Sequence, residues 1–401
     1  MSYIIPKTGL PVEQVLTKLV AELKTQNTVI LQAPPGAGKT TTVPLWLLPE
    51  LETGQKIIML EPRRLAARAA ARRMADLLGE KVGETVGYRI RLDTKVGPKT
   101  RIEVVTEGIL TRLLQEDPEL ADIGAVIFDE FHERNLQTDL GLALTRQCQD
   151  ILREDLKLVI MSATLDAEAV AALLGNAPVV TSKGQLYPVQ TRFLEQPLKG
   201  RPEPVLVREI EDLFKQEKEG DILVFLPGAG EISRVTQALS GFARQQQAVV
   251  LPLYGTLSQM DQDRALLPDP DGRRKIVCAT DIAETSLTIE GVRIVVDGGL
   301  ARKPRFDPGS GMSRLETRRI SRASADQRRG RAGRLGPGIC FRLWTAAEDR
   351  GLLPQSEPEI AIVDLSALAL ELAKWGVTDP EELTWMTVPP SGLLGQARDL
   401  L

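Results

Sequence analysis

The sequence predicts an α/β protein with two halves, each built around a parallel sheet, and three observations support this fold class. Short apolar runs rich in β-branched residues alternate with longer helical patterns. These runs lack polar alternation, as is typical of parallel strands that helices cover on both faces. The alternation stops near residue 182 and resumes near residue 221. We therefore expect two α/β halves with right-handed strand–helix–strand connections.

Six strands separated by helical patterns are expected in the first half. They are TVILQA (28–33), KIIMLE (56–61), RIEVVT (101–106), AVIFDE (125–130), LKLVIMSA (156–163) and APVVT (177–181). Two of the helical patterns between them span residues 63–79 and 136–155. This order predicts a first domain over residues 1–181 with a doubly wound parallel sheet.

The second half begins after a stretch rich in Pro, Gly and Lys at 182–204, and we expect a second domain over residues 182–345. Its expected strands are DILVFLP (221–227), AVVLPLYG (248–255), KIVCAT (275–280), RIVVDGG (293–299) and GICFRLW (338–344). Residues 359–376 predict an amphipathic helix ending at Gly376, within a third, smaller unit over 346–401. The last residues, SGLLGQARDLL, begin another helical pattern, so we expect the chain to be truncated in its C-terminal part.

Composition excludes several classes of protein. No apolar run approaches the roughly 18–20 residues of a membrane span, and the N-terminus lacks the layout of a signal peptide, so we expect a cytoplasmic protein without membrane contact. Cys148, Cys278 and Cys340 are isolated and the chain has a single histidine, which excludes a disulfide framework and a Cys- or His-based metal site. The net charge of −4 is not that of a polycation, yet arginines and lysines cluster at 63–73 and 302–334.

The stretch QAPPGAGKTT (32–41) predicts a phosphate-binding loop, because it follows an expected strand and precedes a helical pattern. Glycine backbone can close around phosphate oxygens where a Cβ atom would clash. A lysine at this place can contact the β- and γ-phosphates of a nucleotide, and the next hydroxyl can bind Mg²⁺. The expected nucleotide-binding residues are Pro35, Gly36, Ala37, Gly38, Lys39, Thr40 and Thr41.

A second acidic element, which a phosphate-binding loop requires, is present in IFDEFHERNL (127–136). Asp129 ends an apolar strand and is expected, with Thr40, to hold Mg²⁺ through water. Glu130 is placed to orient and deprotonate the attacking water. His132, the only histidine, would lie at the edge of this site and couple it to another element, since a neutral imidazole can both donate and accept a hydrogen bond.

The arginine-rich stretch QRRGRAGR (327–334) carries three further candidates, Gln327, Arg331 and Arg334. Small residues between the arginines suggest a helix with Arg331 and Arg334 on one side. Such arginines can act as fingers that neutralise transition-state charge on a γ-phosphate. The alternative is a patch that binds a phosphate backbone, which is the favoured interpretation for the rest of the cluster at 302–334.

The chain resembles superfamily 2 helicases of the DEAH/RHA branch, and more narrowly the bacterial HrpB type with its DEFH box. The motifs that carry this resemblance over nearly the whole chain are APPGAGKTT, EPRRLAA, TEGIL, DEFH, SAT, ILVFLPG, ATDIAETSLTIEG and QRRGRAGR, in the family's order. The resemblance implies two tandem RecA-like P-loop NTPase domains followed by the start of a small helical winged-helix domain. It also implies ATP between the two domains and RNA across them.

By the same resemblance, each matching residue takes the role that its motif has in the family. Glu130, Gln327, Arg331 and Arg334 would be catalytic, and His132 would assist them. Ser162 and Thr164 would link hydrolysis to movement. Asp281 and Glu284 would lie near the nucleotide. The expected nucleic-acid contacts are Arg63, Arg64, Thr106, Thr280, Ser286 and Thr288. The stretch 300–321 resembles the family's β-hairpin, which wedges into a duplex junction, with DPGSGM as a tight turn.

Four positions depart from the family's pattern. Ala33 replaces the first loop glycine, Phe131 fills the third position of the box, and Pro227 stands where many members have Thr. Leu266 stands where many members stack a Phe on the base, although Arg73 could still stack from the other side. We therefore expect poor base discrimination and hydrolysis of several NTPs besides ATP, with Mg²⁺.

The function expected from all this is an ATP-dependent helicase that moves 3′ to 5′ on single-stranded nucleic acid, with RNA favoured, and unwinds duplexes as a monomer. Alternatives are a nucleotide-dependent RNA clamp or remodeller of RNA–protein complexes without processive unwinding, and a DNA-directed helicase. A P-loop switch protein would leave the basic second half unexplained. The sequence does not distinguish RNA from DNA, because 2′-hydroxyl contacts leave no mark on it.

Overall fold

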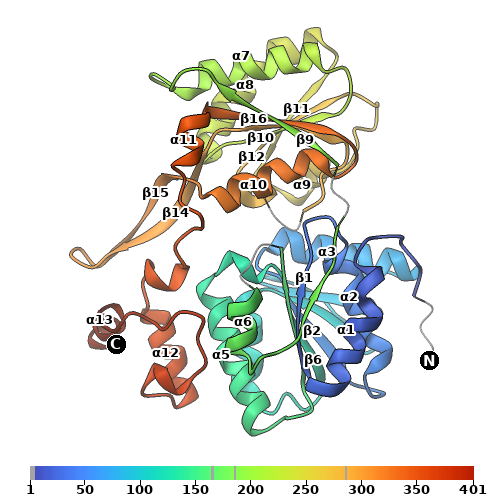
Figure 1. Ribbon diagram of the computed structural model, residues 1–401, viewed down its shortest axis with the longest axis vertical. Helices are drawn as coiled ribbons and strands as arrows, with labels where there is room; N and C mark the ends of the chain where they lie inside the picture. Colours follow the sequence, from blue (N-terminus) through green and yellow to red (C-terminus); the bar gives the residue numbers. More distant parts are fainter. Residues whose placement is uncertain (1–4, 164–166, 185–186, 285–286) are drawn as a thin grey trace. The chain divides into compact units, whose positions relative to one another are not determined.

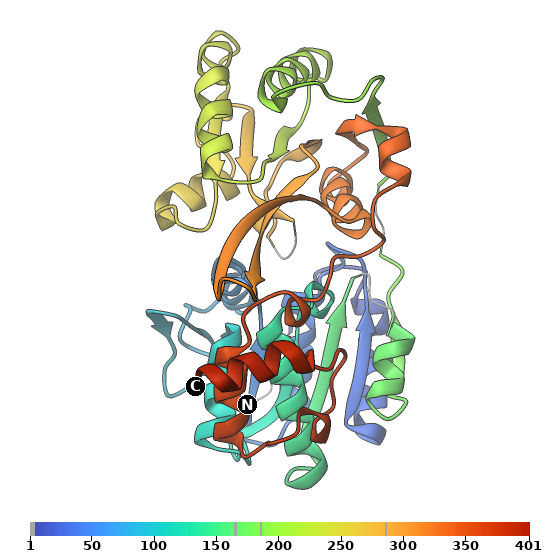
Figure 2. The ribbon, with the colours of Figure 1, turned by 90° about the vertical axis from the view of Figure 1, so that its left-hand side faces the viewer.

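The computed structural model describes residues 5–163, 167–184, 187–284 and 287–401. By its contacts the chain forms two compact units. Unit 1 comprises residues 1–185, 305–313 and 357–401, and unit 2 comprises residues 186–304 and 314–356. Figure 1 and Figure 2 show the chain from two sides, coloured along the sequence. The domain boundaries expected at 181/182 and 345/346 stay a prediction.

An eight-stranded sheet forms the centre of unit 1. In chain order its strands are β1 (Thr28–Gln32), β2 (Lys56–Leu60), β3 (Val86–Ile90), β4 (Asp93–Lys95), β5 (Ile102–Val105), β6 (Ile123–Phe128), β7 (Lys157–Ser162) and β8 (Val179–Thr181). In space the order is β4-β3-β5-β2-β6-β7-β1-β8. Every described pairing is parallel except that of β3 with β4. The α/β fold class with a parallel sheet is thus confirmed for this half.

Helices cover both faces of this sheet, as its continuous apolar strands require. They are α1 (Glu13–Gln26), α2 (Lys39–Leu47), α3 (Arg64–Leu78), α4 (Glu107–Glu116), α5 (Leu136–Ile151) and α6 (Ala167–Leu173), with 3₁₀ turns η1 (Leu48–Glu50) and η2 (Phe131–Glu133). Apolar side chains of α1, α2 and α3 form one core with the sheet, and those of α4, α5 and α6 form another. Figure 1 shows α1 and α2 on the opposite side of the sheet from α5 and α6.

The last 45 residues pack on α5 and form part of unit 1. They contain α12 (Ser366–Trp375) and α13 (Ser391–Leu400), with 3₁₀ turns η5 (Glu359–Ala361) and η6 (Pro380–Glu382). Leu368, Leu372 and Trp385 are buried in the same core as Leu140 and Leu144 of α5. The expected single helix over 359–376 is wrong at its start. It begins at Ser366, whose N–H donates to Asp364 Oδ1 at 2.6 Å, and it ends before Gly376 as predicted.

Unit 2 contains a six-stranded sheet whose described pairings are all parallel. Its strands are β9 (Val189–Leu194), β10 (Asp221–Phe225), β11 (Val249–Leu253), β12 (Lys275–Ala279), β13 (Val292–Asp297) and β16 (Gly338–Thr345), in the spatial order β11-β12-β10-β13-β16-β9. Its helices are α7 (Pro202–Gln216), α8 (Ala229–Gln245), α9 (Gln259–Leu266), α10 (Arg322–Gly330) and α11 (Ala346–Arg350), with η3 (Asp281–Ala283) and η4 (Arg331–Gly333). Figure 1 shows α7 and α8 on one face and α10 on the other.

A two-stranded hairpin completes the fold. It consists of β14 (Leu300–Asp307) and β15 (Met312–Arg319), and residues 305–313 at its tip group with unit 1. Asp307 builds the turn, because its carboxylate accepts from Gly309 N at 3.1 Å and from Ser310 Oγ at 2.7 Å. Gly311 follows with φ of +64°, a left-handed value that favours glycine.

Candidate nucleotide site and arginine cluster

The phosphate-binding loop joins β1 to α2 and depends on two glycines. Gly36 and Gly38 have φ of +83° and +90°, which other residues rarely adopt. A Cβ atom on Gly38 would also lie 2.5 Å from Leu10 Cδ1. Lys39 begins α2, so the positive end of this helix adds to the field at the loop. The backbone of the loop is therefore shaped for an anion.

Lys39 lies in the middle of a buried group of acids. Its side chain is 4% exposed, with Nζ 2.9 Å from Glu130 Oε1 and 3.9 Å from Asp129 Oδ1. Burial alone would lower the pKa of Lys39, but the carboxylates of Glu130, Asp129 and Glu61 raise it above its ordinary value. The ammonium group therefore stays charged in the folded protein.

Thr40 and Asp129, the two expected Mg²⁺ ligands, lie against each other. Thr40 Oγ1 donates to Asp129 Oδ2 at 2.5 Å. Burial raises the pKa of Asp129 to about 6, although Lys39 acts in the opposite direction. The part of the chain that the structure describes holds no cluster of three acidic, His or Cys side chains for a metal. Two oxygen donors beside a phosphate loop fit Mg²⁺, since this ion keeps several waters and takes further ligands from the phosphates.

His132 connects the DEFH box to the SAT motif. Its Nδ1 atom lies 3.4 Å from Glu130 Oε2 and 3.4 Å from the backbone nitrogen of Ala163. A ring without a proton on Nδ1 accepts from Ala163, whereas a ring with that proton donates to Glu130. Ser162 ends β7 and is buried, while Thr164 lies outside the described residues.

Further candidates of unit 1 lie at the same edge of the sheet. Arg63, Thr106 and Asp129 follow the carboxyl ends of β2, β5 and β6, and parallel strands bring these ends together. Arg63 Nη2 lies 3.3 Å from Glu133 Oε2. Arg64 is the first residue of α3, and Arg73 is exposed in the second half of that helix.

The sequence prediction omitted Glu61, which follows β2 and is fully buried. It lies close enough to Lys39 to raise the pKa of this lysine. The available signal was an acid directly after an apolar strand, the pattern that identified Asp129 after β6.

In unit 2 the arginine motif spans the end of a helix. The expected continuous helix is wrong, because α10 ends at Gly330 and Arg331 begins the 3₁₀ turn η4. The turn passes close to the backbone of Tyr187, where a Cβ atom on Gly333 would lie 2.6 Å from the Tyr187 carbonyl oxygen. Side chains three apart in a 3₁₀ turn point the same way, so the predicted common side for Arg331 and Arg334 persists.

Both of these arginines bind the segment that follows β12. Arg331 Nε donates to the carbonyl of Glu284 at 3.0 Å, and Arg331 Nη1 donates to that of Leu287. Arg334 Nη1 donates to the Leu287 carbonyl at 3.0 Å and lies 3.4 Å from Thr288 Oγ1. Arg331 is buried, which does not fit a solvated phosphate patch.

The other candidates of unit 2 have separate surroundings. Gln327 is buried in α10. Thr280 Oγ1 accepts from Ile282 N at 3.4 Å, and Asp281 lies 3.7 Å from Lys303. Ser286 lies outside the described residues. Leu266 ends α9 and is buried.

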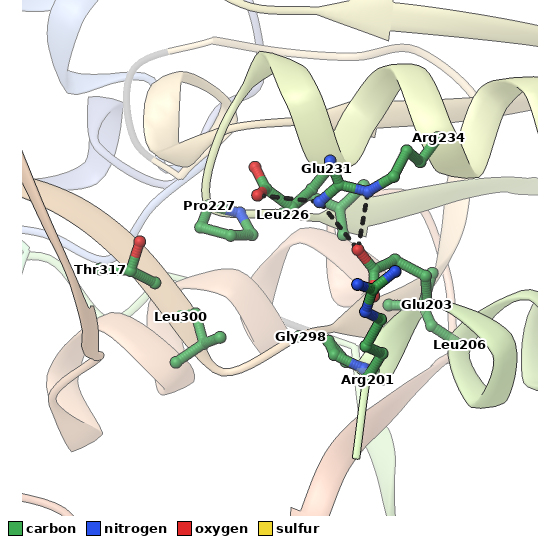
Figure 3. A pocket seen from close by; sticks show the side chains of 11 residues that line it. Arg201, Glu203, Leu206, Leu226, Pro227, Glu231, Arg234, Gly298, Leu300 and Thr317 are labelled. Carbon is green, nitrogen blue, oxygen red and sulfur yellow. Dashed lines mark hydrogen bonds and ion pairs between the residues drawn. The ribbon is translucent and has the colours of Figure 1, made fainter.

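Pro227 lines a cavity of about 430 Å³ in unit 2, shown in Figure 3. Apolar walls come from Pro202, Leu206, Leu226 and Leu300. Arg234 bridges two acids on its rim, at 2.8 Å from Glu203 and 3.0 Å from Glu231. The proline thus offers an apolar wall where many members of the resembled family have a hydroxyl.

Comparison with known proteins places these motifs in a family. Residues 14–173 match the family described as DEAD/DEAH box helicase, and residues 205–336 match the helicase conserved C-terminal domain. The crystal structure of Escherichia coli DEAH/RHA helicase HrpB superposes with a TM-score of 0.92 at 52% identity, over 98% of this chain and 50% of that one. The chain belongs to the DEAH/RHA helicases. Its two sheets are accordingly the tandem RecA-like domains of this family, whereas the winged-helix start stays a prediction.

Two curated relatives match this chain over nearly its whole length. The Escherichia coli K12 protein named ATP-dependent RNA helicase HrpB is 52% identical over 395 residues, which are 98% of this chain and 48% of the relative. The Borreliella burgdorferi protein named ATP-dependent RNA helicase HrpA is 34% identical, over 98% of this chain and 48% of the relative. This DEAH/RHA chain thus spans about half the length of these relatives. Among its described helices, none is long and apolar enough to cross a membrane.

Proposed function

We propose that this chain is the motor part of an ATP-dependent helicase that couples NTP hydrolysis to 3′–5′ movement on single-stranded RNA and to duplex unwinding. The observation that carries the proposal is the meeting of the phosphate loop with the DEFH box. Lys39 Nζ forms an ion pair with Glu130 Oε1 at 2.9 Å, and Thr40 Oγ1 donates a hydrogen bond to Asp129 Oδ2 at 2.5 Å. The name of the relative HrpB, an ATP-dependent RNA helicase, supports the choice of RNA.

In the proposed reaction Lys39 changes its partner. A bound nucleotide places the β- and γ-phosphates beside the ammonium group, which then turns from Glu130 to them. Glu130 becomes available to orient water and take its proton. Thr40 and Asp129 would hold Mg²⁺, which when bound neutralises charge on the phosphate oxygens.

Gln327, Arg331 and Arg334 supply the remaining groups in this proposal. Gln327 positions the attacking water, and the two arginines neutralise charge that develops on the transferred phosphoryl group. Asp281 and Glu284 lie near the nucleotide, and Arg73 stacks on its base. Because Leu266 offers no aromatic ring, several NTPs should serve as substrates.

Contacts to the strand are proposed for Arg63, Arg64, Thr106, Thr280, Ser286 and Thr288. Contacts of this kind go to phosphate and sugar, so sequence preference should be weak and binding should weaken with salt. The hairpin of β14 and β15 would separate the duplex. Ser162 and Thr164, with His132, would link hydrolysis to movement.

The test is steady-state ATP hydrolysis with no polynucleotide, with single-stranded RNA and with single-stranded DNA, using Glu130→Gln as the blank. Stimulation by RNA well above that by DNA is expected. Equal stimulation would contradict RNA as the preferred substrate, and no stimulation would contradict the motor. Deletion of residues 308–311 at the hairpin tip should then abolish unwinding while hydrolysis continues. If the deletion abolishes neither unwinding nor hydrolysis, the hairpin does not act as the wedge that separates the duplex.

A further inference from the structure

Arg328, the second residue of the arginine motif, has a buried environment that the proposed function does not use. Its side chain is 1% exposed. Nε lies 2.9 Å from Glu284 Oε2, and Nη1 lies 2.9 Å from Asp297 Oδ1. The guanidinium carbon lies 4.7 Å from the centre of the Phe225 ring. One fully buried cation is therefore shared by two acids and one aromatic ring.

These partners come from three separate elements of unit 2. Phe225 ends β10, Asp297 ends β13, and Glu284 follows η3. Asp297 is itself fixed, because its Oδ1 atom also accepts from Gly299 N at 2.9 Å. A buried ion pair is costly to desolvate and is weak evidence of stabilisation by itself. The arrangement instead ties α10 to the carboxyl ends of two strands and to the segment after β12.

Glu284 is the connection from Arg328 to the arginines proposed as fingers. Its carboxylate binds Arg328, and its backbone carbonyl accepts from Arg331 Nε at 3.0 Å. A shift of Glu284 would therefore move an acceptor that orients the Arg331 guanidinium. The planar guanidinium of Arg328 reaches its two acids through different nitrogens, a geometry that a lysine ammonium does not reproduce.

We propose that Arg328 is a positioning residue which, through Glu284 and Asp297, fixes the place of the Arg331 guanidinium for the chemical step. This inference rests on the proposed function, because it takes Arg331 to act on the transferred phosphoryl group. The proposed function assigns Arg328 no contact with nucleotide or strand, and its buried guanidinium pairs with Glu284 and Asp297. Its loss should lower kcat with little change in KM, since groups that act in the transition state affect kcat.

The experiment compares kcat and KM for ATP, with saturating single-stranded RNA, in the wild type, Arg328→Lys, Glu284→Gln and the double variant. Both single variants should lose about tenfold or more in kcat, with KM changed by less than about threefold. The double variant should stay within about threefold of the slower single variant, because the two residues act as one unit. Asp297→Asn, at the second acid that binds Arg328, keeps the shape of its side chain and carries the test if Arg328→Lys does not fold.

Arg274→Lys is the matched control for general destabilisation of unit 2. Arg274 comes directly before β12, at the opposite end of this strand from Glu284. Its guanidinium carbon lies 4.0 Å from the centre of the Phe214 ring, and its Nε donates to the Gly220 carbonyl. Thermal unfolding is measured for all variants. Any one of three results would overturn the positioning role. Arg328→Lys could keep the wild-type kcat, its loss in kcat could equal that of Arg274→Lys, or the double variant could show independent losses. If the wild type hydrolyses ATP no faster than Glu130→Gln, the proposed function is refuted, and this inference with it.

Discussion

The Nζ atom of Lys39 lies 2.9 Å from Oε1 of Glu130, and both side chains are almost completely buried. The cation expected to bind phosphate thus neutralises the acid expected to activate water. Because one ammonium group cannot serve both partners fully, nucleotide binding and the release of Glu130 are linked in the proposed mechanism. Substitution of one residue at a time should therefore separate nucleotide binding from hydrolysis.

Glu130→Gln should lower kcat for ATP hydrolysis by about 100-fold or more, the usual contribution of a general base. ATP should bind at least as tightly as in the wild type, because Lys39 loses the acid that competes with phosphate. Steady-state hydrolysis and titration with a fluorescent ATP analogue measure the two effects. A kcat within about threefold of the wild type would exclude Glu130 as the base.

Lys39→Met should destabilise unit 1 by about 3 kcal/mol, since removing one partner of a buried ion pair leaves uncompensated charge. The double variant Lys39→Met with Glu130→Gln should recover part of this loss. Urea unfolding of the four proteins completes the cycle. Additive losses would show that the two side chains do not interact in the folded protein.

His132→Ala should leave ATP affinity unchanged and reduce the number of base pairs unwound per ATP. The reason is that His132 Nδ1 is placed between Glu130 Oε2 and Ala163 N, at 3.4 Å from each. Hydrolysis and unwinding are measured on the same RNA duplex and compared as a ratio. An unchanged ratio would make His132 a bystander.

The sequence was sufficient for features that depend on local pattern. Asp129 could be predicted because an apolar strand ends in an acid, and the carboxyl ends of parallel strands share one edge. The loop glycines could be predicted because the fold around Gly36 and Gly38 needs positive φ. The strands β3, β4 and β9 were missed, since β3 contains Gly87 in a mixed run, β4 has only three residues, and β9 lies in the stretch rich in Pro, Gly and Lys at 182–204.

Features that depend on tertiary contacts could not be predicted in the same way. The helical pattern around Arg331 does not show that α10 ends at Gly330, because the end is set by the close approach of Tyr187 to Gly333. The ion pairs of Arg328 join residues up to 44 positions apart. The start of α12 is set by Asp364 and by the attachment of Glu359 to Leu136 N at 2.8 Å.

The burial of Glu107 beside two other acids should make the stability of unit 1 depend on pH. Burial, together with repulsion from Glu359 and Glu133, raises the pKa of Glu107 to about 7 from an ordinary value of 4.5, and hydrogen bonds from Asn135 and Thr138 only partly oppose the shift. The folded state therefore holds a proton that the unfolded chain has released over this pH range. By linkage, the contribution of Glu107 to stability falls as pH rises from about 4.5 to about 7 and then stays low.

Glu107→Gln should remove this dependence, because the amide oxygen can still accept from Asn135 and Thr138 but carries no charge. The variant should be more stable than the wild type by about 3 kcal/mol at pH 8 and nearly equal to it at pH 4.5. Thermal unfolding at both pH values measures the difference, and Glu116→Gln, at the exposed end of the same helix, is the control for a Glu-to-Gln change without burial. A stability gain at pH 8 no larger than that at pH 4.5 would mean that Glu107 is ionised throughout this range, and that the contacts from Asn135 and Thr138 outweigh its burial beside Glu359.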